Sequence, residues 1–149
     1  DETLKDVQID NAERLNPDLT LSERAMNTLR LDDNRLPRFE MGLGIWTEQT
    51  KKFYPYRKII QENALLDTLD GKSILIHSSP ESVAPEAFYT TAKSFEWLND
   101  VLKLDNGQSL RDGVLYDGDG QVVHVERPQQ LFQRWYSFSL LFDTCEIYK

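Results

Sequence analysis

Hydrophobic and polar positions divide the chain into a polar first part and a more apolar second part. Residues 1–40 are rich in Asp, Asn, Glu and Arg, which predicts a polar N-terminal arm. Within the arm, Thr20 and Glu23 have the spacing of a capping box, and a narrow apolar stripe follows. This pattern predicts one short helix from Leu21 to about Leu31. Residues 41–149 are predicted to form a single globular domain.

Short apolar runs, separated by Gly, Asp and Asn, continue from residue 41 to the end of the chain. Their alternation and the turn residues between them predict β-strands. The predicted strands are Met41–Thr47, Lys51–Tyr54, Lys72–His77, Ala87–Tyr89, Phe95–Leu98, Gly113–Tyr116, Gln121–Glu126 and Glu146–Tyr148. The Asp-Gly pairs at 117–120 give the strongest hairpin signal, because tight turns require positive φ angles.

Two further segments have helical spacing. One is Tyr56–Glu62, for which Pro55 suits the first turn. The other follows Pro128, where the aromatic residues fit a helical face and a strand equally well, and the proline favours a helix. Short strands with two or three short helices predict an α+β fold with a small, mainly antiparallel sheet.

Composition narrows the classes of partner. The chain has 149 residues, with 17 Lys and Arg against 25 Asp and Glu, a formal net charge of −8. This charge argues against binding to nucleic acid or to an anionic membrane surface. The apolar runs are too short for a membrane span. Cys145 is the single cysteine, which excludes an internal disulfide and a cysteine-based metal cluster within the chain. A first residue Asp1 fits a matured export product, a fragment or a trimmed chain.

The order of short motifs from about Gly42 to Tyr148 resembles a bacterial family of domains of unknown function, family 3179. The motifs that carry the resemblance are Gly42-Leu43-Gly44-Ile45, Lys52-Phe53-Tyr54-Pro55-Tyr56, Leu69-Asp70-Gly71-Lys72 with Ile74-Leu75-Ile76, Pro80, Ala87-Phe88, Phe132, Trp135, Asp143-Thr144 and Ile147-Tyr148. The resemblance implies a bacterial, extracytoplasmic domain, for example in the periplasm, and supplies no activity. The family places two cysteines around the proline, where this chain has Ser79 and Ser82, so no thiol or metal chemistry carries over.

The loop around the Asp-Gly pairs is comparable with a calcium-binding loop. Asp117, Asp119 and Glu126 would take positions three, five and twelve of that motif. Position one would be Leu115, which offers no carboxylate. A plain hairpin is therefore the preferred interpretation, and no metal ion or other cofactor is expected.

Two groups of residues are candidates for binding. His77, Ser79 and Ser82 lie at a strand end and in the loop after it, but the chain has no nucleophile elbow to activate a serine. Arg134, Trp135 and Tyr136 form the second group, since arginine and aromatic residues are enriched at interfaces. For the aromatic side chains, burial in the core is the more common alternative.

These observations favour a non-catalytic interaction or accessory domain that binds another protein subunit. One alternative is an enzyme of unknown type, with a pocket around His77 to Glu86. Another is an accessory subunit of a larger, redox-active assembly whose cofactor belongs to a partner.

Overall fold

The computed structural model of the chain describes residues 33–78 and 84–149. Within them, Asn34–Lys149 forms one compact unit. The unit therefore begins before Met41, where the globular domain was predicted to start. The helix predicted at Leu21–Leu31 lies outside the described residues.

Residues 34–40 belong to the unit because backbone hydrogen bonds attach them to it. The amide of Trp135 donates to the carbonyl of Glu40 at 2.8 Å. The amide of Tyr136 donates to the carbonyl of Arg38 at 3.0 Å. This segment of the predicted arm is thus part of the folded body.

The described residues form eleven strands and two short helices. In chain order they are β1 (Met41–Trp46), β2 (Lys51–Pro55), α3 (Tyr56–Ile59), β3 (Ala64–Leu69), β4 (Lys72–His77), β5 (Glu86–Tyr89), β6 (Phe95–Leu98), β7 (Val101–Leu104), β8 (Ser109–Arg111), β9 (Val114–Tyr116), β10 (Gln129–Arg134), α4 (Trp135–Leu141) and β11 (Glu146–Ile147).

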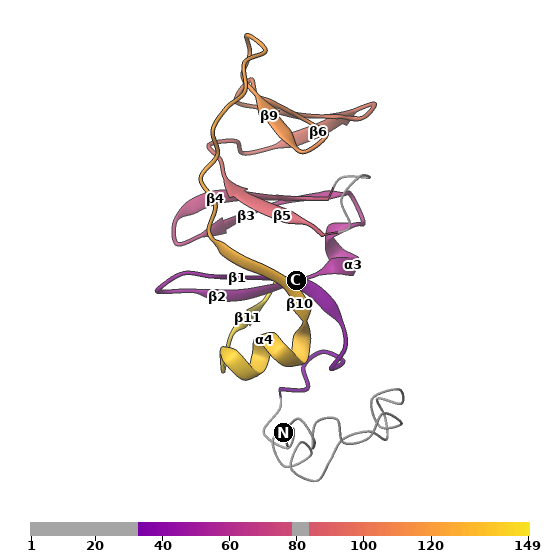
Figure 1. Cartoon of the computed structure of the whole chain (residues 1–149), viewed down its shortest axis with the longest axis vertical. Helices are drawn as coiled ribbons and strands as arrows, with labels where there is room; N and C mark the ends of the chain where they lie inside the picture. Colours follow the sequence, from indigo (N-terminus) through magenta and orange to yellow (C-terminus); the bar gives the residue numbers. More distant parts are fainter. Residues whose placement is uncertain (1–32, 79–83) are drawn as a thin grey trace, which may run out of the picture. The chain divides into compact units, whose positions relative to one another are not determined.

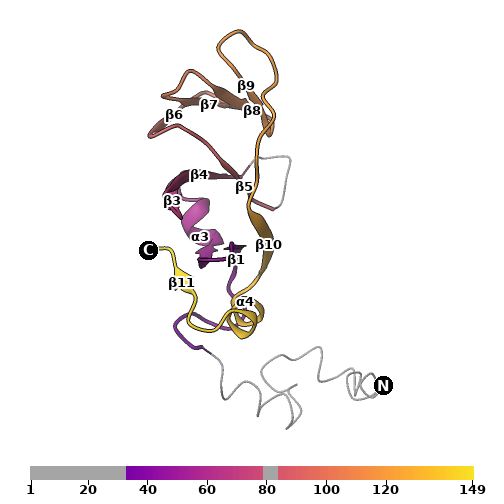
Figure 2. The same ribbon diagram turned by 90° about the vertical axis from the view of Figure 1, so that its left-hand side faces the viewer.

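The strands build three sheets. The first sheet has the order β10-β1-β2-β11, the central sheet β3-β4-β5 and the third sheet β6-β7-β8-β9. All neighbouring strands pair antiparallel except β11, which runs parallel to β2. The sheets lie as layers, with α4 on the outer face of the first sheet (Figures 1 and 2). The fold is therefore mainly β, with mostly antiparallel sheets and short helices.

The hydrophobic core continues through both faces of the central sheet. Successive side chains of a strand point to opposite faces. Ile74 and Ile76 of β4 pack in the cluster shared with the first sheet, whereas Leu75 packs in the cluster shared with the third sheet. A strand buried on both faces is a continuous apolar run, which explains the Ile74-Leu75-Ile76 sequence.

Two glycines of β1 lie where a side chain would not fit: Gly44 against α4 and Gly42 against the neighbouring strand β2. A Cβ atom added to Gly44 would lie 2.6 Å from Cε1 of Phe138 in α4. At Gly42, a Cβ would lie 2.6 Å from the Tyr54 carbonyl oxygen and from Cε2 of Phe53. Trp135 and Phe138 fill the space between the helix and the sheet and are fully buried.

Many predicted strands are confirmed, with small changes at their ends: β1, β2, β4, β5, β6, β9 and β11. Four strands were not predicted: β3, β7, β8 and β10, the last of which lies in a segment predicted as a helix. The helix predicted at Tyr56–Glu62 is shorter, because α3 ends at Ile59 and Asn63 has a left-handed φ of 58°.

The helix predicted to start at Pro128 is wrong in its first half. Gln129–Arg134 forms β10, and α4 begins only at Trp135. β10 pairs with β1 over its whole length, so pairing with a distant segment outweighs the local helical spacing. Pro128 precedes a strand, where its missing N–H removes no ladder hydrogen bond.

The strand predicted at Gln121–Glu126 is also wrong. In this segment only Val122 forms an isolated bridge, with Tyr116. The chain then reaches the edge of the central sheet, where the Glu126 carbonyl accepts a hydrogen bond from the Tyr89 amide at 2.8 Å. The backbone is therefore shared between two sheets instead of extending one hairpin.

Candidate functional site

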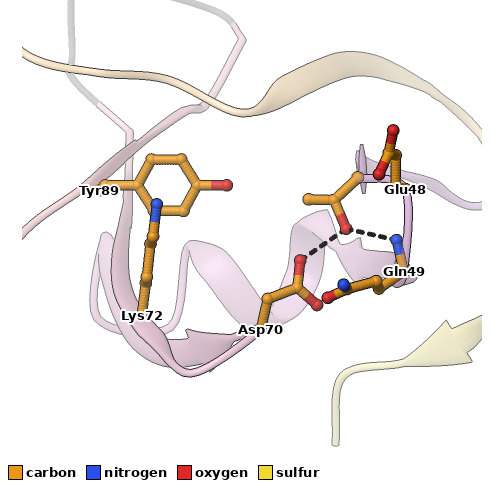
Figure 3. Close-up of a pocket in the computed structure, with 6 residues that line it drawn as sticks. Glu48, Gln49, Asp70, Lys72 and Tyr89 are labelled. Atoms are coloured by element: carbon orange, nitrogen blue, oxygen red, sulfur yellow. Dashed lines mark hydrogen bonds between the residues drawn. The ribbon is translucent and has the colours of Figure 1, made fainter.

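A polar depression of about 260 Å³ opens between the β1–β2 turn, the β3–β4 hairpin and β5 (Figure 3). Its lining residues are Thr47, Glu48, Gln49, Asp70, Lys72 and Tyr89. The turn and the hairpin belong to different sheets, so this surface exists only when the first and central sheets are stacked.

Hydrogen bonds hold the Asp70 carboxylate in a fixed position. Thr47 Oγ1 donates to Asp70 Oδ2 at 2.6 Å, and Thr50 Oγ1 donates to Asp70 Oδ1 at 2.5 Å. Thr47 Oγ1 also accepts hydrogen bonds from the amides of Gln49 and Thr50. The bonds from Thr47 and Thr50 lower the pKa of Asp70, so this side chain is a carboxylate at neutral pH.

Lys72 and Tyr89 form the opposite side of the polar depression. The Lys72 ammonium lies 5.1 Å from the centre of the Tyr89 ring, a cation–π distance. The Tyr89 hydroxyl points toward the side that carries Asp70 (Figure 3). Partial burial, with Asp70 and Glu126 nearby, raises the pKa of Tyr89, so its hydroxyl remains a hydrogen-bond donor.

The polar depression combines donors and acceptors of both charges. Its cation is Lys72, and its carboxylates are Glu48 and Asp70. The sequence predicts the Asp70-Gly71 turn but gives no signal that Thr47 lies beside it. The site was missed because its residues meet only through the stacking of two sheets.

A second feature is an exposed apolar surface on α4. Trp135, Phe138 and Ser139 face the first sheet, so Tyr136, Ser137, Leu140 and Leu141 face outward. Leu141 is 65% exposed and Leu140 is 43% exposed. We call these four outward-facing residues the α4 outer surface.

Two flanking residues enlarge the α4 outer surface. Phe39 packs edge-on against Tyr136, with their ring centroids 5.6 Å apart. The Arg134 guanidinium lies 5.4 Å from the centre of the Phe39 ring. Of the predicted binding group, Arg134 is exposed and Tyr136 is half-buried, whereas Trp135 is fully buried in the core.

His77 ends β4 and is 5% exposed. Its ring packs against Phe88, with centroids 5.6 Å apart. Burial is the main cause that lowers the pKa of His77 to about 4. The positive charge of Arg127 adds to this effect, whereas the negative charge of Glu86 opposes it. Ser79 and Ser82 lie outside the described residues, so a grouping of these serines with His77 stays a prediction.

In the loop that was compared with a calcium-binding loop, Asp117 stabilises the turn. Asp117 Oδ1 accepts hydrogen bonds from the amides of Asp119 at 2.8 Å and Gln121 at 2.9 Å. Gly120 has the positive φ of 82° that a tight turn needs. In residues 33–78 and 84–149, no three His, Cys, Asp or Glu side chains lie close enough together to hold a metal ion. Asp117, Asp119 and Glu126 therefore do not form such a group.

Comparison with known proteins found no matching family model, no matching curated protein and no matching solved structure. The resemblance to family 3179 therefore stays a prediction from the motifs. Neither helix in the described part of the chain is long and apolar enough to cross a membrane.

Proposed function

We propose that this chain is a non-catalytic interaction domain that binds another protein subunit through the α4 outer surface. The observation that carries the proposal is the exposure of Leu140 and Leu141 side by side on a helix whose other face is buried. Contiguous exposed apolar surface marks protein contact sites.

The residues around the two leucines support a protein partner. Tyr136, Phe39 and Arg134 are of the types enriched at protein interfaces. Their mutual packing fixes the rings before binding, which reduces the entropy lost on association. The net charge of −8 makes nucleic acid an unfavourable alternative.

The resemblance to family 3179 supports placing this interaction in a bacterial, extracytoplasmic compartment. In that setting the domain would act as an accessory subunit of a larger complex. Any redox cofactor of such a complex would belong to the partner.

Site-specific photo-crosslinking in the source organism tests the proposal. A benzophenone amino acid replaces Leu141 in one variant and Val122, which is 68% exposed in another part of the unit, in the matched control. We expect position 141 to give one discrete adduct with a different polypeptide, and position 122 to give none.

A third variant ties the adduct to the surface itself. Leu140→Asp, combined with the crosslinker at position 141, should remove the adduct while circular dichroism and the melting temperature stay near those of the parent. Equal adducts from both positions, the lack of any adduct, or an adduct of two copies of this chain would each contradict the proposal.

A further inference from the structure

We propose that the polar depression binds a free amino acid as its zwitterion, with the carboxylate at Lys72 and Tyr89 and the ammonium at Asp70 and Glu48. The inference stands apart from the α4 outer surface, because none of these four residues belongs to that surface or flanks it.

Lys72 and Tyr89 provide the end of the polar depression that would receive a carboxylate. Among the described residues, no carboxylate lies within ion-pair distance of the Lys72 ammonium. The cation–π contact with Tyr89 holds the ammonium in place without neutralising its charge. An ammonium and a phenolic hydroxyl together offer the charged and neutral donors that a carboxylate accepts.

Asp70 and Glu48 provide the end that would receive an ammonium group. Each Asp70 oxygen accepts one threonine hydrogen bond, and each retains a lone pair for a second donor. The two threonines keep the carboxylate oriented before any ligand arrives, so little further ordering is needed on binding. Glu48 extends the acidic side from the adjacent turn (Figure 3).

The presence of both charges selects among ligand classes. A simple anion would be attracted to Lys72 but repelled by Asp70 and Glu48. A simple cation would be attracted to Asp70 and Glu48 but repelled by Lys72. A volume of about 260 Å³ is also below the roughly 300 Å³ at which pockets for drug-sized molecules begin, which favours a very small ligand.

Titration of the isotopically labelled full chain followed by NMR tests the proposal with three probes. L-alanine carries both charges, N-acetyl-L-alanine lacks the ammonium and L-alaninamide lacks the carboxylate. We expect L-alanine to shift the amide signals of Gln49, Lys72 and Tyr89 with a dissociation constant of about 1 mM, as suits so few atoms. Each singly charged probe should bind about tenfold more weakly.

Two lysine variants distinguish binding in the polar depression from a general effect of surface charge. Lys72→Met should weaken L-alanine binding about tenfold, while Lys103→Met, on an exposed strand position of the third sheet, should leave it unchanged. Equal binding of the three probes, a lack of saturable shifts with L-alanine, or equal effects of the two substitutions would overturn the inference. None of these results bears on crosslinking at position 141.

Discussion

At the scale of single residues, His77 makes the stability of the fold depend on pH. Its imidazole is buried beside Phe88, and burial lowers its pKa from 6.5 to about 4. The unfolded chain therefore binds a proton at this site between pH 6.5 and pH 4, whereas the folded chain does not. Stability from this group is fully present above pH 6.5 and is lost as the pH falls toward 4.

We predict that the free energy of unfolding falls by about 2 kcal/mol between pH 7 and pH 5 because of His77. Urea denaturation at the two pH values measures this change. The variant His77→Gln cannot take up the proton, so its free energy of unfolding should change much less over the same interval. A pH dependence that is the same in both proteins would contradict the assignment.

For single residues, the sequence predicts only part of what the structure shows about their burial and contacts. It places His77 at the end of a strand and makes it a candidate binding residue together with the serines that follow it. It does not show that Phe88 covers the imidazole, since this contact comes from the neighbouring strand. For Trp135, the sequence leaves burial and binding open; in the structure its ring packs against Phe53 and is fully buried.

At the scale of elements, local turn chemistry is a reliable guide and ambiguous periodicity is not. The hairpin between β3 and β4 follows from Asp70 and Gly71, whose φ angles of 54° and 81° suit a tight turn. The segment 129–134 fits both a helical and a strand period, and only pairing with β1 resolves the choice. β7 and β8, of four and three residues, were missed although β6 and β9 have the same lengths and were predicted, so length alone does not explain the difference.

The edge of β5 shows how one side chain can replace a strand. The side-chain Oε1 of Gln130 in β10 accepts a hydrogen bond from the Ala87 backbone amide at 2.8 Å, and its Nε2 donates to the Ala87 backbone carbonyl at 3.0 Å. It thereby pairs backbone groups that would otherwise lack a partner at the sheet edge. This contact also joins the first sheet to the central one.

We predict that Gln130→Ala lowers the free energy of unfolding by about 2 kcal/mol, because it leaves the backbone groups of buried Ala87 unpaired. Gln129→Ala, at the exposed neighbouring position, should change it by less than about 0.5 kcal/mol. Chemical denaturation of both variants provides the comparison. Similar effects of the two substitutions would argue against the edge-capping role.

At the scale of the whole unit, polar contacts join the hydrophobic layers. Between the first and central sheets, Asp67 accepts hydrogen bonds from the Lys52 ammonium at 2.8 Å and from the Tyr54 hydroxyl at 2.7 Å. Partial burial raises the pKa of Asp67, but these two bonds outweigh it and the net pKa lies below its usual value. The sequence could not predict the order of the three sheets, because that order depends on contacts between distant segments.

The α4 outer surface is a property of the same scale. The sequence suggested Arg134, Trp135 and Tyr136 as one candidate binding group and did not separate the buried Trp135 from the other two. The exposure of Leu140 and Leu141 depends on α4 beginning at Trp135, because this start determines which side chains face away from the sheet. Their exposure leaves apolar area that association with another protein would remove from water.

Native mass spectrometry on material purified from the source organism tests whether this domain binds a different protein subunit. We predict a stable complex that contains this chain and a second, different polypeptide, and that dissociates when Leu140 and Leu141 are both replaced by Asp. A monomer of this chain, or a complex built only from copies of it, would contradict the proposed interaction.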